Sequence, residues 1–168
     1  MAATLRDEGV LLSGRAIEEQ PPHYLIGAVD TPVEPSPNWS PAPLFAKIEA
    51  GARFVQTQFC FDPALAKNYA TALRSAGMAE TVRLLIGLGS ISSARSARWM
   101  RKNLFGVDVP DTIVDRLEKA SDSAAEGRRI CVELMQQMQD IPGVDGVHLM
   151  AVQDQQEIVR VLDESGLR

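Results

Sequence analysis

Two glutamines, Gln56 and Gln58, interrupt an otherwise apolar segment at 51–62 (GARFVQTQFCFD). In a β-strand, residues two positions apart lie on the same face, so both amides face one side and Thr57 faces the other. A buried amide is costly unless it is hydrogen-bonded. The two side chains therefore either bind backbone of the protein itself or bind a ligand, and the pattern leaves both interpretations open.

Other polar residues are candidates for chemistry, each with a plainer alternative. Lys47 lies in a predicted helix, where a lysine is usually a solvated surface charge. Asp30 ends a predicted strand and could contact a ligand or cap the loop through an Asx-turn. His148 lies within a strand and is more typical of a satisfied core group than of a catalyst. Trp39 could stack on a flat ring or cover the core, and Asp62 reads first as a helix N-cap.

Composition and missing motifs exclude several classes of function. The net charge is −5, which argues against a nucleic-acid partner. No apolar run approaches the roughly 20 residues that span a bilayer, and no signal peptide opens the chain. The sequence has no GxGxxG fingerprint, no P-loop and no metal-ligand spacing. Cys60 and Cys131 read as reduced core thiols, so we expect a cytoplasmic protein with no membrane, nucleic-acid or metal partner.

The elements that would position these residues alternate between strand and helix. Four near-continuous apolar runs predict buried parallel strands, at 23–29, 53–58, 83–88 and 146–151. Helical segments with apolar stripes follow each of them. This alternation predicts an α/β protein with a parallel sheet, and the length of 168 residues favours a single domain over 1–168.

Capping residues predict where the helices begin. Ser40-Pro41 and Asp62-Pro63 each place a cap before a proline, and glycines 51 and 77 end these two helices. Further helices are expected from Ser92 or Ser93, after Pro110 and from about Ser123. The last is predicted to start at Asp154, with Glu157 completing a capping box, and to bury Ile158, Val161 and Leu162.

Four strands are half of an eight-stranded (β/α)8 barrel, and a whole barrel takes roughly 250 residues. The opening residues 5–9 (LRDEG) read as the last turns of a helix with its glycine stop, as though a preceding part were missing. The fold expected is therefore a partial TIM barrel, in which Gln56 and Gln58 face the barrel interior near the carboxyl end of their strand.

The stretch AGARFVQTQFCFD, preceded by Lys47, resembles the methylenetetrahydrofolate reductase family of flavin-dependent (β/α)8 barrels, whose motif reads roughly AGA-x-x-x-x-TQ-x-x-FD. Further matches occur in the family's order: IGAVDTP, LLIGLGSISSARSARWM, GVDVPDTIVDRLEK and GVDGVHLMAVQD. Together they cover nearly the whole chain and place it on the second half of the barrel.

The resemblance implies reduction of 5,10-methylenetetrahydrofolate to 5-methyltetrahydrofolate with FAD as cofactor and NADH or NADPH as electron donor. By the same resemblance Gln58 would contact the pterin of the folate substrate and Lys47 the FAD phosphates, with Asp30 and Ala28 also at the cofactor. The family's catalytic acid lies in the first half, so no catalytic residue is assigned. We therefore expect this chain by itself to be inactive, and to work as a homo-oligomer or with a complementing N-terminal half.

The chain also departs from the family pattern. Met150 stands where a tyrosine is usual, and Asp154 stands where an arginine helps to bind the folate tail. Ser40 and Pro43 replace an aspartate and an asparagine at the flavin, and Ala94 aligns with a phenylalanine of the folate pocket. The departures at Met150 and Asp154 favour one alternative, a non-catalytic folate- or flavin-binding partner subunit or truncated product. A third interpretation is a related flavin barrel that uses another one-carbon or methyl carrier.

Overall fold

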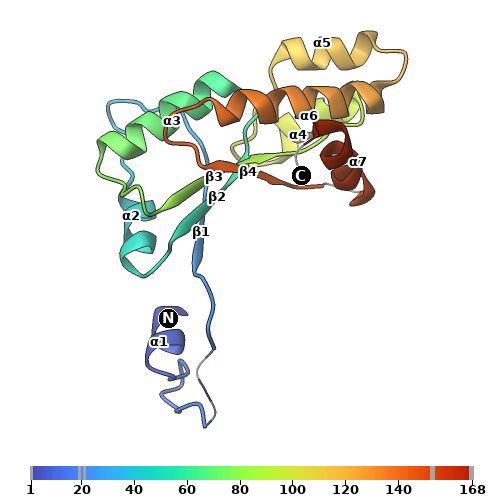
Figure 1. Cartoon of the computed structure of the whole chain (residues 1–168). Helices are drawn as coiled ribbons and strands as arrows, with labels where there is room; N and C mark the ends of the chain where they lie inside the picture. Colours follow the sequence, from blue (N-terminus) through green and yellow to red (C-terminus); the bar gives the residue numbers. More distant parts are fainter. Residues whose placement is uncertain (1, 19, 21, 152–153, 167–168) are drawn as a thin grey trace.

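Four parallel strands form one sheet in the order β1-β2-β3-β4 (Figure 1). They are β1 (Gly27–Asp30), β2 (Phe54–Phe59), β3 (Arg83–Leu88) and β4 (Gly146–Leu149). The structure is a computed structural model and describes residues 2–18, 20, 22–151 and 154–166. The predicted α/β class and the four parallel strands are confirmed, with flanking helices as in part of a TIM barrel.

Seven helices are described: α1 (Ala2–Asp7), α2 (Ala42–Glu49), α3 (Pro63–Ser75), α4 (Ala94–Asn103), α5 (Asp111–Lys119), α6 (Ser123–Gln139) and α7 (Gln156–Ser165). The caps are local. Asp62 accepts a hydrogen bond from the Ala64 N–H at 2.8 Å, and the Ser93 Oγ accepts one from the Ser96 N–H at 3.1 Å. Gly77, with φ +102°, follows α3 as predicted.

Several boundaries differ from the prediction, among them the end of β4, which was expected at residue 151 and lies at Leu149. The strand expected at 23–29 begins only at Gly27, because that is where pairing with β2 starts. Helix α2 begins at Ala42, one residue later than expected, although the Ser40 Oγ still accepts from the Ala42 N–H at 3.3 Å. Helix α7 begins at Gln156, and the Asp154 carboxylate accepts from the N–H of that residue at 2.9 Å.

The capping box predicted for the last helix is wrong. Instead of turning back to Asp154, the Glu157 carboxylate forms ion pairs with Arg128 of α6 and with Arg160. Leu162 was expected to be buried but is 43% exposed, whereas Val161 is buried. Ion pairs from Arg128 thus link α7 to α6, and Val161 is the residue of α7 that is buried in the core.

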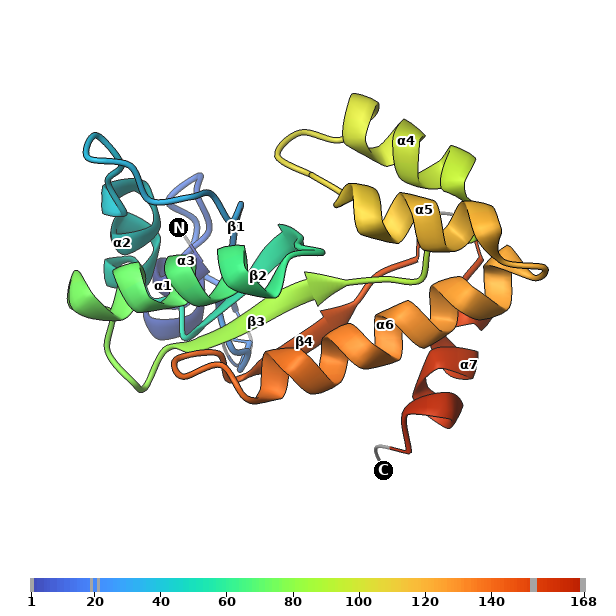
Figure 2. The same cartoon turned by 90° about the horizontal axis from the view of Figure 1, so that it is seen from above.

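The helices α3 and α6 lie over one face of the sheet, and the opposite face carries no such layer (Figures 1 and 2). Alternate residues of the strands reflect this: Val55, Leu84 and Ile86 are fully buried, whereas Val29 on the other face is 69% exposed. In a closed barrel the uncovered face would be the interior. Within the described residues, β1 and β4 each pair on one side only.

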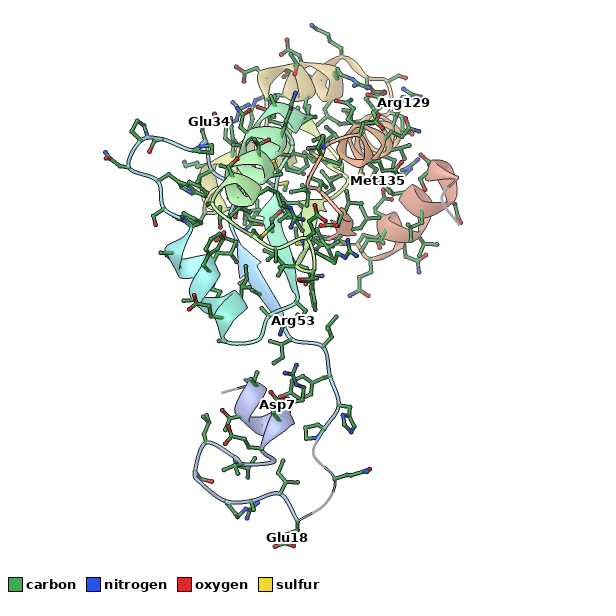
Figure 3. The ribbon with its side chains drawn as sticks, turned by 60° about the vertical axis from the view of Figure 1, so that its left-hand side comes forward. Asp7, Glu18, Glu34, Arg53, Arg129 and Met135 are labelled. Carbon is green, nitrogen blue, oxygen red and sulfur yellow. The ribbon has the colours of Figure 1, made fainter. Side chains whose placement is uncertain are left out.

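The two ends of the sheet are distinct. Figure 3 shows Arg53, which precedes β2, near the N-terminal segment that carries Asp7 and Glu18. Glu34, which follows β1, lies at the opposite end and accepts a hydrogen bond from the Asn68 amide at 2.9 Å. The carboxyl ends of the parallel strands thus meet away from the N-terminal segment. None of the described helices is long and apolar enough to cross a membrane.

Candidate functional site

A cavity of about 580 Å³ lies on the uncovered face, toward the carboxyl ends of β1, β2 and β4. We call it the strand-end cavity; its lining residues are Val29, Asp30, Thr31, Lys47, Gln56, Thr57, Gln58, His148 and Met150. The fold thus brings together five of the residues that the sequence singled out: Asp30, Lys47, Gln56, Gln58 and His148. Carboxyl ends of strands are where α/β barrels place their active sites.

Ala28 does not join them. Strand alternation turns its side chain toward the helices, where it is buried in the hydrophobic core, while its neighbour Val29 faces the cavity. Ala28 belongs to the strand that ends at the cavity, but its side chain points away from the cavity. A role for this side chain at a cofactor therefore has no geometric support in this structure.

The two glutamine side chains differ in their hydrogen bonding. The Gln58 Oε1 accepts a hydrogen bond from the Phe59 N–H at 3.0 Å, so part of this amide binds backbone. Its NH2 group has no protein partner in the part of the chain that the structure describes, and neither does the amide of Gln56. Both side chains are half-buried and line the cavity. The geometry therefore combines the two interpretations: Gln58 binds its own backbone through oxygen and has its nitrogen available.

Lys47 reaches the cavity from α2. Its Nζ donates a hydrogen bond to the Val29 carbonyl at 2.6 Å, and no carboxylate among residues 2–18, 20, 22–151 and 154–166 pairs with it. An ammonium group has three N–H donors, so the carbonyl leaves two for a ligand. Lys47 is exposed, as the plainer interpretation expected, yet its charge is held at the end of β1.

Asp30 is tied to the helix layer. The Tyr69 hydroxyl donates to its carboxylate, and burial, followed by this hydrogen bond, raises the pKa of Tyr69 well above its ordinary range. Trp39 packs edge-on against Tyr69 with 6.1 Å between ring centroids. Trp39 thus contacts the Tyr69 ring and is not among the residues that line the strand-end cavity.

His148 lines the same cavity from β4. Its Nε2 lies 2.7 Å from the Thr57 carbonyl oxygen of β2. The ring is half-buried and hydrogen-bonded, in line with a satisfied core group, but it also faces the cavity. The sequence offered no partner for His148, because the partner lies 91 residues away.

A second cavity of about 490 Å³ lies between the start of α4 and the segment that joins β4 to α7. We call it the α4 cavity; its lining includes Ser90, Arg95, Trp99, Asp154 and Glu157, and it shares Met150 with the strand-end cavity. The Ser90 Oγ is buried, with no hydrogen-bond partner among the described residues. Polar and aromatic groups thus continue from one cavity into the next.

Sequence reasoning missed Arg95 and Trp99. They are four residues apart, so they share one face of α4, opposite the buried Ala97. Trp99 is 49% exposed, and Arg95 has no ion-pair partner in the described part of the chain. The sequence contained a usable signal for these two residues: a cation and an aromatic residue four positions apart, both outside the apolar stripe of the helix. Ala94, which the resemblance aligned with a family phenylalanine, is buried in the core instead.

The pattern that defines the methylenetetrahydrofolate reductase family matches residues 28–166. A probable methylenetetrahydrofolate reductase (NADPH) from Caenorhabditis elegans is 28% identical over 128 residues, which is 74% of this chain and 19% of that protein. This chain therefore spans about a fifth of the length of that relative.

Among solved structures, an uncharacterized protein from Clostridium thermocellum, described as binding two copies of 5-methyl-5,6,7,8-tetrahydrofolic acid, matches with a TM-score of 0.54. The match has 20% sequence identity and covers 84% of this chain and 52% of that one, so it shows a shared fold. The family pattern covers most of the chain, from residue 28 to residue 166, and therefore this chain belongs to the methylenetetrahydrofolate reductase family.

Proposed function

We propose that this chain supplies the folate-binding half of a flavin-dependent oxidoreductase that reduces 5,10-methylenetetrahydrofolate to 5-methyltetrahydrofolate. The observation that carries the proposal is the convergence of Gln58, Lys47 and Asp30 in one cavity at the strand ends. Membership of the family and the folate bound by the Clostridium thermocellum protein support it. In this proposal a complementing half-barrel, or a second copy of this chain, packs against the face of the sheet that carries no helices. The protein is proposed to act in the cytoplasm.

A reduced folate has a flat pterin, an aryl ring and an anionic glutamate tail. The strand-end cavity offers the pterin the NH2 group of Gln58 and the amide of Gln56. The adjoining α4 cavity offers Trp99 to the aryl ring. It offers the tail the guanidinium of Arg95, which forms no ion pair with any of the described residues. Met150 lines both cavities, and in this proposal one extended ligand occupies the two.

The residues present fit one part of FAD. Lys47 keeps two N–H donors at the end of β1 and has no carboxylate among the described residues, which suits a phosphate. When bound, a flavin supplies hydride transfer, with NADH or NADPH as the donor. Asp30 is held by Tyr69 and contributes an acceptor at the same edge. In the proposal the catalytic acid comes from the complementing half.

A non-catalytic folate-binding subunit is the second candidate. Asp154 lines the α4 cavity as an exposed carboxylate without an ion pair in the described part of the chain. A carboxylate at this place repels an anionic glutamate tail, which counts against productive placement of the substrate in the α4 cavity. Binding without turnover, after a complementing half is supplied and NADH or NADPH is added, would favour this candidate over the enzyme.

Isothermal titration calorimetry with 5-methyltetrahydrofolate tests the proposal on the full chain. Gln58→Ala is expected to raise Kd about tenfold, because a ligand acceptor loses its donor inside a cavity. Gln136→Ala, on the exposed side of α6, is the matched control and should leave Kd unchanged. Wild-type protein that shows no binding at millimolar folate, or equal Kd values for both variants, would contradict a folate site at Gln58.

A further inference from the structure

His148 forms a hydrogen bond that passes over a whole strand. The sheet order places β3 between β4 and β2, yet the His148 Nε2 lies 2.7 Å from the Thr57 carbonyl oxygen. The residue of β3 that pairs with His148 is Gly87. A Cβ atom on Gly87 would lie 2.5 Å from the Thr57 oxygen and 2.7 Å from the Met150 Cε. The missing side chain is therefore what leaves room for the imidazole to reach β2.

The carbonyl that His148 binds belongs to an irregularity in β2. From one paired position to the next, β2 advances from Gln56 to Phe59 while β3 advances from Leu85 to Gly87, so β2 contains one extra residue. Such a β-bulge bends the strand and re-aims the side chains beside it. The extra residue falls within the pair Thr57 and Gln58, and both residues line the strand-end cavity.

Side chains bind the backbone groups of this bulge. The Gly87 N–H donates to the Thr57 Oγ1 at 2.9 Å, and this hydroxyl donates to the Gln58 carbonyl at 2.9 Å. The Phe59 N–H donates to the Gln58 Oε1 at 3.0 Å. The fourth hydrogen bond at the bulge joins the His148 Nε2 to the Thr57 carbonyl oxygen. The orientation of the Gln58 amide is thus part of a network that has His148 at one end.

The network also determines which atoms face a ligand. A carbonyl oxygen only accepts, so the His148 Nε2 must carry the hydrogen, and in the neutral ring the Nδ1 is then an acceptor. A backbone N–H only donates, so the Gln58 oxygen faces Phe59 and its NH2 group is the part left for the cavity.

We propose that His148 is a positioning residue that holds the bulge of β2, so that Gln58 presents its NH2 group to the cavity. Because an NH2 group only donates, Gln58 then selects a ligand edge that carries hydrogen-bond acceptors. The identity of the ligand as a folate rests on the proposed function above, whereas the geometry of the bulge does not. A pterin edge with a carbonyl oxygen and a ring nitrogen lone pair satisfies this requirement.

Three variants of the full chain test the proposal. His148→Leu removes the donor, His148→Gln retains an N–H donor on a side chain of similar reach, and His23→Gln alters the other, exposed histidine as a control. By NMR, the Phe59 amide should exchange about fivefold faster with solvent in His148→Leu, reflecting one lost hydrogen bond, and the Gln58 NH2 resonances should move. His148→Gln should restore both, and His23→Gln should change neither.

Binding of 5-methyltetrahydrofolate separates positioning from a general loss of structure. We expect His148→Leu to raise Kd about fivefold in the wild type but to have no further effect when Gln58 is already alanine, because its action passes through Gln58. Equal losses in both backgrounds would overturn the positioning role.

A measurement on the unmodified protein tests the proposal even if a His148 variant does not fold. The imidazole ¹⁵N shifts of His148 should report hydrogen on Nε2 and a bare Nδ1 at alkaline pH. The opposite tautomer, or a Phe59 amide indifferent to His148→Leu, would overturn the proposal. If the NMR results agree but no folate binds, the proposed function fails while the positioning role of His148 stands.

Discussion

Tyr69 of α3 donates a hydrogen bond from its phenolic hydroxyl to the carboxylate of Asp30 at the end of β1. This contact links the helix layer on one side of the sheet to the strand-end cavity on the other. Tyr69 is fully buried, and Trp39 closes over it edge-on. Because burial and the neighbouring carboxylate raise the pKa of Tyr69, the hydroxyl remains a donor across the physiological range.

Tyr69→Phe should therefore lower the free energy of unfolding by about 1–2 kcal/mol, since it leaves a part-buried carboxylate without its donor. Urea denaturation followed by circular dichroism measures the change. Tyr24→Phe is the matched control: the Tyr24 hydroxyl bonds the Ala2 carbonyl at the surface, and its loss should cost much less. Equal effects of the two substitutions would show that the contact with Asp30 does not stabilise the fold.

Gly87→Ala should destabilise the protein by about 1–3 kcal/mol, the usual cost of forcing extra atoms into a packed site. The added Cβ would meet the Thr57 and Gln58 carbonyl oxygens at 2.5 and 2.8 Å, and strand backbone cannot move aside as a side chain can. Gly146→Ala on the adjacent strand is the control, because there the nearest atom is a flexible leucine methyl at 3.3 Å. Thermal unfolding that ranks Gly146→Ala as the worse variant would contradict the close approach at Gly87.

Asp145 joins the starts of β3 and β4. Its carboxylate accepts hydrogen bonds from Arg74, Arg83 and the Leu84 N–H, each at 2.8 Å, and its side chain is 18% exposed. Asp145→Asn should lower the free energy of unfolding by about 2 kcal/mol, because hydrogen bonds to a charged acceptor are lost or weakened.

The control for this substitution is Asp108→Asn, whose carboxylate is 79% exposed and faces Arg101 at 3.3 Å. Exposed ion pairs contribute little, so this variant should unfold at nearly the same urea concentration as the wild type. A comparable shift in both variants would mean that Asp145 acts only as a surface charge.

The two thiols predict a loss of stability at alkaline pH. Burial raises the pKa of Cys60 to about 11 and that of Cys131 to about 12, from an ordinary value of 9.0. Above pH 9 the unfolded chain therefore releases thiol protons that the folded chain retains, and the free energy of unfolding falls as pH rises toward 11–12. Below pH 9 these two groups should contribute no slope.

Denaturation curves measured from pH 8 to 11 check this prediction. The double variant Cys60→Ala and Cys131→Ala should show a shallower decline than the wild type over the same range, whatever its stability at pH 8. Tyrosines and lysines also titrate there, so the difference between the two slopes is the quantity to compare. Identical slopes would show that the thiols are accessible in the folded state.

Much of the fold could be predicted because its signals are local. Asp62 and Ser93 cap helices through bonds to residues two or three positions away, and the apolar run at 83–88 became β3 with the predicted bounds. The misses arose where a distant partner decided the outcome. Glu157 was expected to bind back to Asp154, but Arg128 on α6 provides a stronger, charged partner.

The order of strands and helices, the shared face of Gln56 and Gln58, and the family could all be predicted from the sequence. The roles of Gln58, Lys47 and Asp30 at a ligand remain predictions, although the fold brings the three together. The folded chain was needed to show that Gln58 binds the Phe59 N–H through its side-chain oxygen and that His148 reaches the Thr57 carbonyl over Gly87. Those contacts depend on a β-bulge and on the register between distant strands, which side-chain periodicity along one strand does not encode.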